Sequence, residues 1–324
     1  MVKRGLTGLC QALPMNPDAR DGGPAWSLAT EAEGWRRVTP TPSAAALQAF
    51  YAGEYFQASH GTYAQAYSEE EVAHRNLVAR LLLAAIDEAR GTPEGGTGRL
   101  LEIGCGEGWF LAAADAAGYA VRGLDFSQAG LAKFHPQLLD RAEFGDAFES
   151  LDRLIDEGAQ VDVCVMEHVL EHVADPAALV ARLPRLLAPG GVAAFTVPND
   201  FSPLQLAARA AGAVDRDFWL AAPQHLNYFN AATLPAFLAR GGFEVRLGYA
   251  SFPIDWFLMH PGSNYVADPA QGKPAHQARM AIDLVLAKAG MGAYLGLAKA
   301  FFACGAGRSL TVVARPLAKV GGAA

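Results

Sequence analysis

The sequence has few cysteines and few charged residues, and each shortage excludes a class of protein. Four cysteines stand at positions 10, 105, 164 and 304 without a CxxC pair, which predicts neither a zinc knuckle nor a disulfide framework. Cys105 and Cys164 lie in or beside apolar runs, so we expect buried thiols in a reducing, cytoplasmic compartment. Charged residues make up 18%, and the net charge is -7 without a dense basic run, which argues against a nucleic-acid partner.

Long apolar runs are also missing. The most apolar late segment, residues 280–305, is interrupted by Asp283, Lys288, Lys299 and several glycines. A membrane span needs about 20 mainly apolar residues, so we expect packed helices there and no membrane partner. Residues 1–14 lack an apolar stretch of signal-peptide length. Hydrophobic residues still make up 52%, enough for a sizeable core.

Four units follow from the pattern along the chain. Residues 1–95 read as an N-terminal arm, loose up to Pro42, followed by a helical lid. Residues 96–250 read as an α/β domain with an insertion at 201–232, residues 251–308 as a helical insertion, and residues 309–324 as a last strand and tail. The lid shows two apolar stripes at helical spacing: Ala46, Leu47, Phe50 and Tyr51, then Leu77, Val78, Leu81, Leu82 and Ile86.

Strand-like and helix-like runs alternate after a Gly/Thr/Pro-rich linker at residues 91–97. We expect strands at 100–103, 120–124, 161–166, 192–197, 244–249 and 309–314. Helices are expected at 109–117, 176–187 and 233–240, and the acidic run 69–71 at a solvated helix start. This alternation implies right-handed crossovers, and therefore a doubly wound, mostly parallel α/β sheet with helical N-terminal and C-terminal additions.

A glycine-rich turn follows the first of these strands. Residues 100–108 read LLEIGCGEG, in which glycines let the backbone turn sharply and approach a ligand. In the dinucleotide-binding fingerprint G-x-G-x-x-G, the third glycine falls at Trp109, where a bulky indole fits helix packing poorly. The spacing here is instead G-x-G-x-G, with Glu102 two positions before the first glycine.

With this spacing the chain resembles the class I S-adenosylmethionine (SAM)-dependent methyltransferases. The resemblance implies a seven-stranded sheet, SAM as cofactor, a SAM-binding domain at 96–250 and a substrate cap at 251–308. It implies that Asp125, at the end of the second strand, accepts hydrogen bonds from the ribose hydroxyls. It also implies that Asp146 contacts the adenine amino group. The cofactor-binding residues implied are Glu102, Gly104, Cys105, Gly106, Gly108, Asp125, Phe126, Asp146, Ala147, Phe148 and Glu167.

The segment 166–176 closes the fourth strand, and its residues 170–176 resemble an element of methyltransferases related to the ubiquinone-biosynthesis O-methyltransferase. In some of those relatives, acids and a histidine there hold a divalent metal, but His168 stands where the first acid aligns, and we expect no metal. His168 is a candidate general base, and Glu171 a residue that orients the loop. The pattern H-x-x-E-H ending at His172 also occurs in metalloproteases, but their helical context is missing.

Further polar groups follow the fifth strand. His225, Asn227 and Tyr228 offer hydrogen bonds and base chemistry, and His225 and Tyr228 join His168 as candidate catalytic residues; a loop packed through Tyr228 is the alternative. Together with residues 252–279, this element resembles bacterial methyltransferases of surface-glycan or secondary-metabolite gene clusters. Lys273 and Arg279 could pair an acceptor phosphate or carboxylate, or face solvent.

The sequence thus predicts an enzyme that methylates a small molecule, with oxygen in a polar metabolite or sugar derivative as the expected acceptor. N- or C-methylation is an alternative; the Asn/Asp-Pro-Pro-Tyr/Phe element of many amino-group methyltransferases is missing after the fourth strand. Two functions of a different kind also stay open, a nicotinamide-dependent oxidoreductase and a non-catalytic SAM-binding protein. The oligomeric state is left open.

Overall fold

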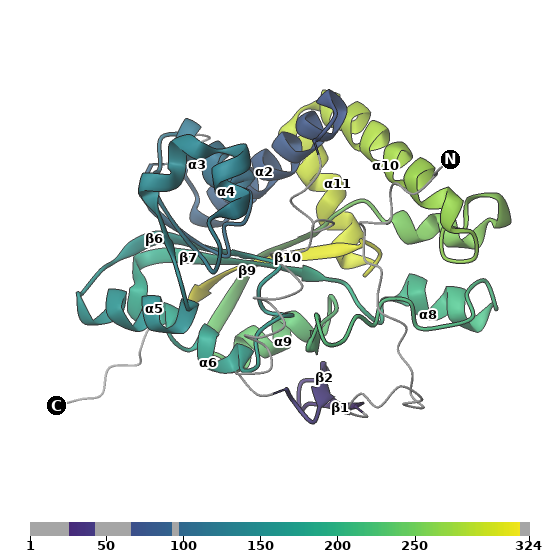
Figure 1. Ribbon diagram of the computed structural model, residues 1–324, viewed down its shortest axis with the longest axis horizontal. Helices are drawn as coiled ribbons and strands as arrows, with labels where there is room; N and C mark the ends of the chain where they lie inside the picture. Colours follow the sequence, from purple (N-terminus) through teal and green to yellow (C-terminus); the bar gives the residue numbers. More distant parts are fainter. Residues whose placement is uncertain (1–25, 43–65, 93–96, 318–324) are drawn as a thin grey trace.

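A seven-stranded sheet forms the centre of the molecule (Figure 1). The structure, a computed structural model, describes residues 26–42, 66–92 and 97–317. The strand order is β5-β4-β3-β6-β7-β10-β9, and the last strand along the chain, β10, runs antiparallel to both of its neighbours. The strands are β3 (Arg99–Ile103), β4 (Ala120–Asp125), β5 (Ala142–Phe144), β6 (Val161–Glu167), β7 (Leu187–Pro198), β9 (Phe243–Ala250) and β10 (Ser309–Pro316). The predicted α/β class and mostly parallel seven-stranded sheet are confirmed.

Apolar side chains leave both faces of the central strands, because successive residues of a strand point to opposite sides. Leu101 of β3 packs into the core of one face, while its neighbour Leu100 packs into the core of the other. Met166 and Val165 of β6 divide in the same way. A sheet buried on both faces needs continuous apolar strands, which is how these runs read in the sequence.

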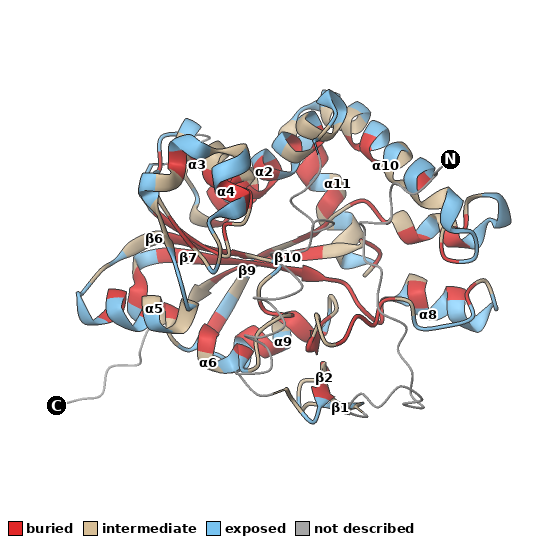
Figure 2. Ribbon diagram, in the orientation of Figure 1, coloured by how far each residue is buried: buried red, intermediate tan, exposed pale blue. Residues whose placement is uncertain are grey.

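Helices cover the two faces, so that the strands are the most buried layer (Figure 2). One face carries α2 (Glu69–Arg90), α3 (Trp109–Ala116), α4 (Ala129–Phe134) and α11 (Met291–Ala303). The other carries α5 (Ala147–Asp156), α6 (Pro176–Val180), α7 (Leu183–Leu186) and α9 (Thr233–Arg240). The remaining helices are α8 (Pro203–Ala210) and α10 (Gly272–Leu286), with short 3₁₀ turns η3 (Pro136–Arg141), η4 (Ile254–Met259), η5 (Pro261–Ser263), η6 (Pro269–Gln271) and η7 (Ala287–Ala289).

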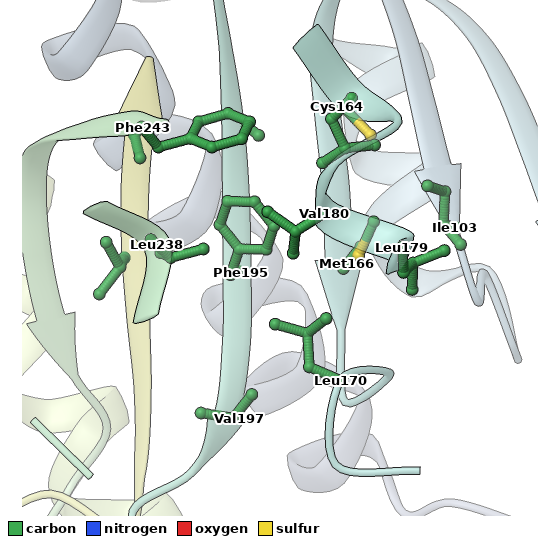
Figure 3. Packing of buried hydrophobic residues seen from close by; sticks show 14 of the residues in the cluster. Ile103, Cys164, Met166, Leu170, Leu179, Val180, Phe195, Val197, Leu238 and Phe243 are labelled. Carbon is green, nitrogen blue, oxygen red and sulfur yellow. The ribbon is translucent and has the colours of Figure 1, made fainter. Parts of the chain in front are cut away.

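Close packing joins the helices of the second face to the strands. Leu179 and Val180 of α6 lie over the strands that carry Met166 and Phe195 (Figure 3). Phe195 and Phe243 meet edge to face with ring centroids 5.8 Å apart. Each such fully buried side chain contributes about 1.5–3 kcal/mol of transfer free energy. This packing fixes the strand ends at which the candidate site lies.

The predicted helix start at the acidic run is confirmed at α2. Ser68 and Glu71 form a capping box, in which each side chain accepts a hydrogen bond from the other's backbone N–H. The stripe Leu77, Leu81, Leu82 and Ile86 is buried as expected, but Val78 is exposed. The stripe at residues 46–51 lies outside the described residues.

The predicted single helix over 176–187 is wrong. The structure has two short helices, α6 and α7, and β7 begins at Leu187, before the Pro-Gly-Gly turn. Pro184 lies inside the predicted helix, and a proline lacks the N–H that an interior helical residue donates four residues back. The chain therefore breaks at Ala181 and Arg182 and restarts with Pro184 near the new N-terminus.

A three-stranded sheet that the sequence did not predict lies beside the core. Strands β1 (Ser27–Thr30) and β2 (Arg36–Thr39) form a hairpin, and β2 pairs with β8 (Asn227–Tyr228). Residues 26–42 are thus ordered structure rather than a loose arm. The predicted insertion 201–232 supplies β8, which connects this hairpin to the site described below.

The predicted units share their cores. One cluster includes Leu82 of α2, Leu100 of β3, Tyr294 of α11 and Val313 of β10, so the helical additions pack directly on the sheet. Cys105 and Cys164 are buried, as expected. In the described part of the chain, no helix has the length and apolar character to cross a membrane.

Candidate functional site

A glycine bend connects β3 to α3 at the carboxyl-terminal edge of the sheet. Gly104, Gly106 and Gly108 have φ angles of 77°, 51° and 81°, in the left-handed region that side chains disfavour. A Cβ on Gly104 would lie 2.5 Å from Cγ2 of Val169, so that position has no room for alanine. The backbone N–H groups of Gly104 and Cys105 both donate to the carbonyl of Leu124, at 2.7 and 3.1 Å, which fixes the bend to β4.

Asp125 lies directly beside this bend. Its Oδ2 accepts from the N–H of Gly106 at 2.7 Å and its Oδ1 from the N–H of Ser127 at 2.9 Å. Burial raises the pKa of Asp125, partly offset by these backbone hydrogen bonds. Since each carboxylate oxygen has two lone pairs, Asp125 keeps acceptor capacity for a ligand's hydroxyl groups.

Two further carboxyl groups lie near Asp125, one buried and one partly buried. Glu102 of β3 is 3% exposed, and its Oε2 has no hydrogen-bond partner. Burial raises the pKa of Glu102 well above 4.5, and the charges of Glu167 and Asp125 raise it further. Burial also raises the pKa of Glu167, at the end of β6. Clustered acids of this kind are costly to ionise unless a cation joins them, so the cluster fits a positively charged ligand.

The predicted adenine-binding element adjoins Asp125, the acid predicted to bind the ribose. Phe144 of β5 lies opposite Asp125 of β4, and the N–H of Gly145 donates to the carbonyl of Asp125 at 2.9 Å. Asp146 caps α5 by accepting from two backbone N–H groups through Oδ1. Ala147 and Phe148 pack against the core, and Phe126 is 45% exposed at the end of β4. The structure therefore brings these residues together, and their roles toward a cofactor stay predictions.

Cys105 is less suited to a ligand than the sequence suggested. Its side chain lies in the core under Gly123, where an added Cβ would be 2.9 Å from its Sγ. Its N–H donates to Leu124 and its carbonyl accepts from Gly108, so its backbone is already used. The geometry favours a packing role for Cys105 over the predicted cofactor contact.

Glu107, inside the glycine bend, is a residue that the sequence prediction missed. Its carboxylate accepts from the hydroxyl of Tyr67 and from Nε1 of Trp109, both at 2.7 Å, and pairs with Arg75 at 3.4 Å. The rings of Tyr67 and Phe134 are in contact at a tilt of 32°, with centroids 5.1 Å apart. Glu107 thereby ties the start of α2 to the bend. The aromatic residues that precede α2 in the sequence, Tyr67 among them, were the one feature that could have indicated this contact.

Beyond Glu167, the chain turns at the predicted base. His168 has a φ of 56°, and its N–H donates to the carbonyl of Thr196 at 2.9 Å. Its Nδ1 lies 2.9 Å from Oε1 of Glu171, which is 1% exposed, whereas 47% of the His168 side chain is exposed. Residues 168–172 form a turn and no helix, unlike the protease motif that shares their pattern.

The two side chains shift each other's pKa. Burial alone would raise the pKa of Glu171, but the hydrogen bond with His168 and the nearby histidines lower it to about 2. Burial alone would lower the pKa of His168, but Glu171 raises it above 6.5. Glu171 therefore stays ionised and holds the Nδ1–H of His168, which leaves Nε2 as the ring atom that can accept a proton.

The second polar segment packs against this turn. The N–H groups of Leu226 and Asn227 donate to the carbonyl of Glu171 at 2.6 and 3.2 Å. The rings of His225 and His172 meet edge to face, with centroids 4.9 Å apart. Nδ1 of His225 is buried without a partner, and burial lowers the pKa of His225 to about 3. His225 is therefore neutral at ordinary pH and a weaker base than His168.

Tyr228 uses its hydroxyl within the protein. The hydroxyl donates to the carbonyl of His225 at 2.9 Å and accepts from the N–H of Ala221 at 3.2 Å. The ring is 1% exposed, and burial raises the pKa of Tyr228. The geometry favours a role in shaping the loop over the predicted catalytic role.

Glu171, His172 and His225 can each direct one ligand atom so that all three atoms lie within 4.8 Å of one another. This set differs from the one considered in the sequence, because His225 replaces His168. His172 Nδ1 already lies 2.8 Å from the carbonyl of Gln224. The expectation of no metal stays a prediction.

The chain belongs to the methyltransferase domain family, whose sequence profile matches residues 69–247. Over 149 residues it is 35% identical to a probable S-adenosylmethionine-dependent methyltransferase of Mycolicibacterium smegmatis, a match that covers 45% of this chain and 52% of that relative. Over 186 residues it is 30% identical to a ubiquinone biosynthesis O-methyltransferase of Ruegeria pomeroyi, covering 55% and 74%. In the first two curated relatives, the matched region spans only about half of the relative's own length, 52% and 44%.

A solved S-adenosylmethionine-dependent methyltransferase from Mesorhizobium loti is also similar, with 23% identity and a TM-score of 0.43 over 74% of this chain and 99% of that one. The family match confirms the predicted methyltransferase class and disfavours an oxidoreductase. Trp109 agrees with this, since its indole is held by Glu107 where a dinucleotide-binding helix needs glycine.

Proposed function

We propose that this chain transfers a methyl group from SAM to a hydroxyl group of a small polar molecule. The observation that carries the proposal is the glycine bend at residues 104–108, which adjoins the buried carboxyl group of Glu102 and the partly buried ones of Asp125 and Glu167. SAM supplies an electrophilic methyl group on a sulfonium cation. Its positive charges suit the acidic cluster, and its ribose hydroxyls suit the free lone pairs of Asp125.

His168 is the proposed general base. Glu171 orients the ring and stabilises the protonated form, so that Nε2 can take the proton of an acceptor hydroxyl as the new bond to oxygen forms. The exposure of the His168 side chain makes it accessible to an acceptor, unlike Tyr228, whose ring is buried. Because SAM is already a reactive donor, positioning of the acceptor supplies much of the rate.

The proposal extends to the acceptor and the location. A small-molecule acceptor fits residues 251–308 as a substrate cap, and the cytoplasm fits the free thiols of Cys105, Cys164 and Cys304. Nucleic acid is not an expected partner.

Methyl transfer tests the proposal. SAM with a labelled methyl group is incubated with the protein and a panel of hydroxylated metabolites, and both labelled product and S-adenosylhomocysteine (SAH) are measured. We expect both to appear together with at least one acceptor, and His168→Gln to reduce turnover at unchanged SAM affinity. SAM binding without product across the panel would favour a non-catalytic SAM-binding protein, and no SAM binding would refute the proposal.

A further inference from the structure

Two arginines outside the glycine bend interact through their charges, and one of them, Arg308, lies at the strand ends that also hold the His168 turn. Arg308 directly precedes β10, and its carbonyl accepts from the N–H of Asn199, which follows β7. The His168 N–H donates to the carbonyl of Thr196 near the same end of β7, and the positive charge of Arg308 lowers the pKa of both His168 and His225. Arg279 comes from α10 in the helical insertion, and the charges of the two arginines act on each other.

Arg308 has acidic partners that partly neutralise it. Its Nη1 lies 3.2 Å from Oδ1 of Asp200, which is 1% exposed, while 25% of the Arg308 side chain is exposed. Burial raises the pKa of Asp200 to about 7, so near neutral pH this carboxyl is only partly ionised. Asp255 also acts on Arg308, but its own carboxylate is held by the side chains of Gln205 and Tyr265.

Arg279 is partly buried and lacks the partners that such a cation normally has. Its Nε is buried without a hydrogen-bond partner. Within the described ranges no carboxylate lies at ion-pairing distance from it. Asp283, about one turn further along α10, is hydrogen-bonded to Nε2 of His74 at 2.9 Å and to the hydroxyl of Tyr294 at 2.7 Å. Burial lowers the pKa of Arg279, which means that the fold holds this charge at a cost.

We propose that Arg279 and Arg308 form a subsite that binds a carboxylate or phosphate group of the methyl acceptor. A planar guanidinium with free N–H donors matches the oxygens of such a group, often by two parallel hydrogen bonds. This inference rests on the proposed function and narrows its substrate class to anionic small molecules. It also revises the pair suggested by the sequence, because Lys273 is exposed at the start of α10 and Arg308 takes its place.

The negative charge of the acceptor can belong to a carboxylate or to a phosphate group, so the test uses acetate and inorganic phosphate as probes. Each is titrated into the SAH-loaded protein, and binding is measured by calorimetry and by the rise in unfolding temperature. Arg279→Met removes the unpartnered cation with little change in side-chain volume. Lys273→Met removes an exposed charge from the same helix and is the matched control. Arg279→Lys keeps the charge but not the planar fork.

We expect the wild type and Lys273→Met to bind at least one probe equally, and Arg279→Met to bind it about tenfold more weakly or not at all. Arg279→Lys should fall between them. Arg279→Met should also unfold at a temperature no lower than that of the wild type, since it removes an unpaired, partly buried charge. A merely structural arginine would instead give a lower unfolding temperature and unchanged probe binding.

No binding of either probe to the wild type overturns the inference, as does equal binding by Arg279→Met. If Arg279→Met does not fold, Arg279→Lys decides, because unchanged probe affinity in that variant contradicts recognition by the planar fork. SAM titrations of the same samples keep the two proposals apart. If the wild type does not bind SAM, the proposed function is refuted. If the wild type binds SAM but neither probe, only the subsite is refuted.

Discussion

Replacing Glu102 by glutamine should weaken SAM binding and stabilise the free protein at the same time. Glu102 is buried beside two other acids, and its Oε2 has no partner. Glu102→Gln keeps the shape of the side chain and removes its charge. If the carboxylate binds a cationic group of SAM, its loss costs about 1.5–3 kcal/mol, or roughly 10- to 150-fold in affinity.

The effect on stability depends on pH with a definite sign. The pKa of Glu102 is raised in the folded protein above its ordinary value of 4.5. A raised pKa means that the folded state keeps the proton that the unfolded state has already lost. The stability of the wild type therefore falls by up to about 1.4 kcal/mol per pH unit from about pH 4.5 up to the raised pKa. Glu102→Gln has no such titration.

Denaturant unfolding at about pH 5 and about pH 8, with calorimetric titration of SAM, measures both effects. We expect the stability advantage of Glu102→Gln to be larger at the higher pH. Glu244→Gln is the control, because Glu244 is exposed at the start of the edge strand β9, away from the interior strand β3 that carries Glu102. The reasoning fails if Glu102→Gln is less stable than the wild type at pH 8, or if its SAM affinity equals that of the wild type.

Three further predictions concern the bend, the base and the loop. Gly104→Ala should lower the free energy of unfolding by about 2–4 kcal/mol, because of the positive φ of Gly104 and the contact of the new Cβ with Val169. Adding Val169→Ala to this variant should restore only the part of the loss that is due to the contact. Full restoration, or no loss in the first place, in denaturant unfolding would contradict this prediction. Turnover should fall as the pH drops through the pKa of His168, above 6.5, because the base must be neutral, and His168→Gln should lack this limb of the pH–rate profile; an unchanged profile excludes His168. Tyr228→Phe should cost about 1–2 kcal/mol of stability through its lost bonds to His225 and Ala221, with turnover per folded molecule within about threefold; a much larger loss of turnover restores the catalytic interpretation.

The sequence predicts the elements whose signals are local. The strand into the glycine bend, helix α9 and the acidic start of α2 each depend on adjacent residues, and the structure has them where expected. The broken helix over 176–187 shows the limit of prediction from local patterns. The apolar spacing typical of a helix continues through Pro184, but a proline in the helix interior cannot donate the backbone hydrogen bond, so the helix is interrupted. Strand β5, with three residues, carries too short a pattern to be recognised.

Contacts between distant segments account for what the sequence missed at the site. The β2–β8 pairing joins residues almost 200 positions apart, and no local pattern predicts it. The contacts of Tyr228 and Cys105 likewise come from the fold, so residue type alone suggested catalytic and ligand roles where geometry favours packing. The role of Glu107 was missed for the same reason, because its partner Tyr67 lies 40 residues away. Conversely, Arg308 belongs to no recognised sequence motif, and only the interaction of its charge with His168 in the folded protein indicates a role.

The most direct test of the central claim is a crystal structure of the protein with bound SAH. The account predicts electron density for the nucleoside against Gly104–Gly108, with both ribose hydroxyls within hydrogen-bonding distance of the Asp125 carboxylate. Density for the nucleoside elsewhere, or an Asp125 carboxylate that does not contact the sugar, would contradict it.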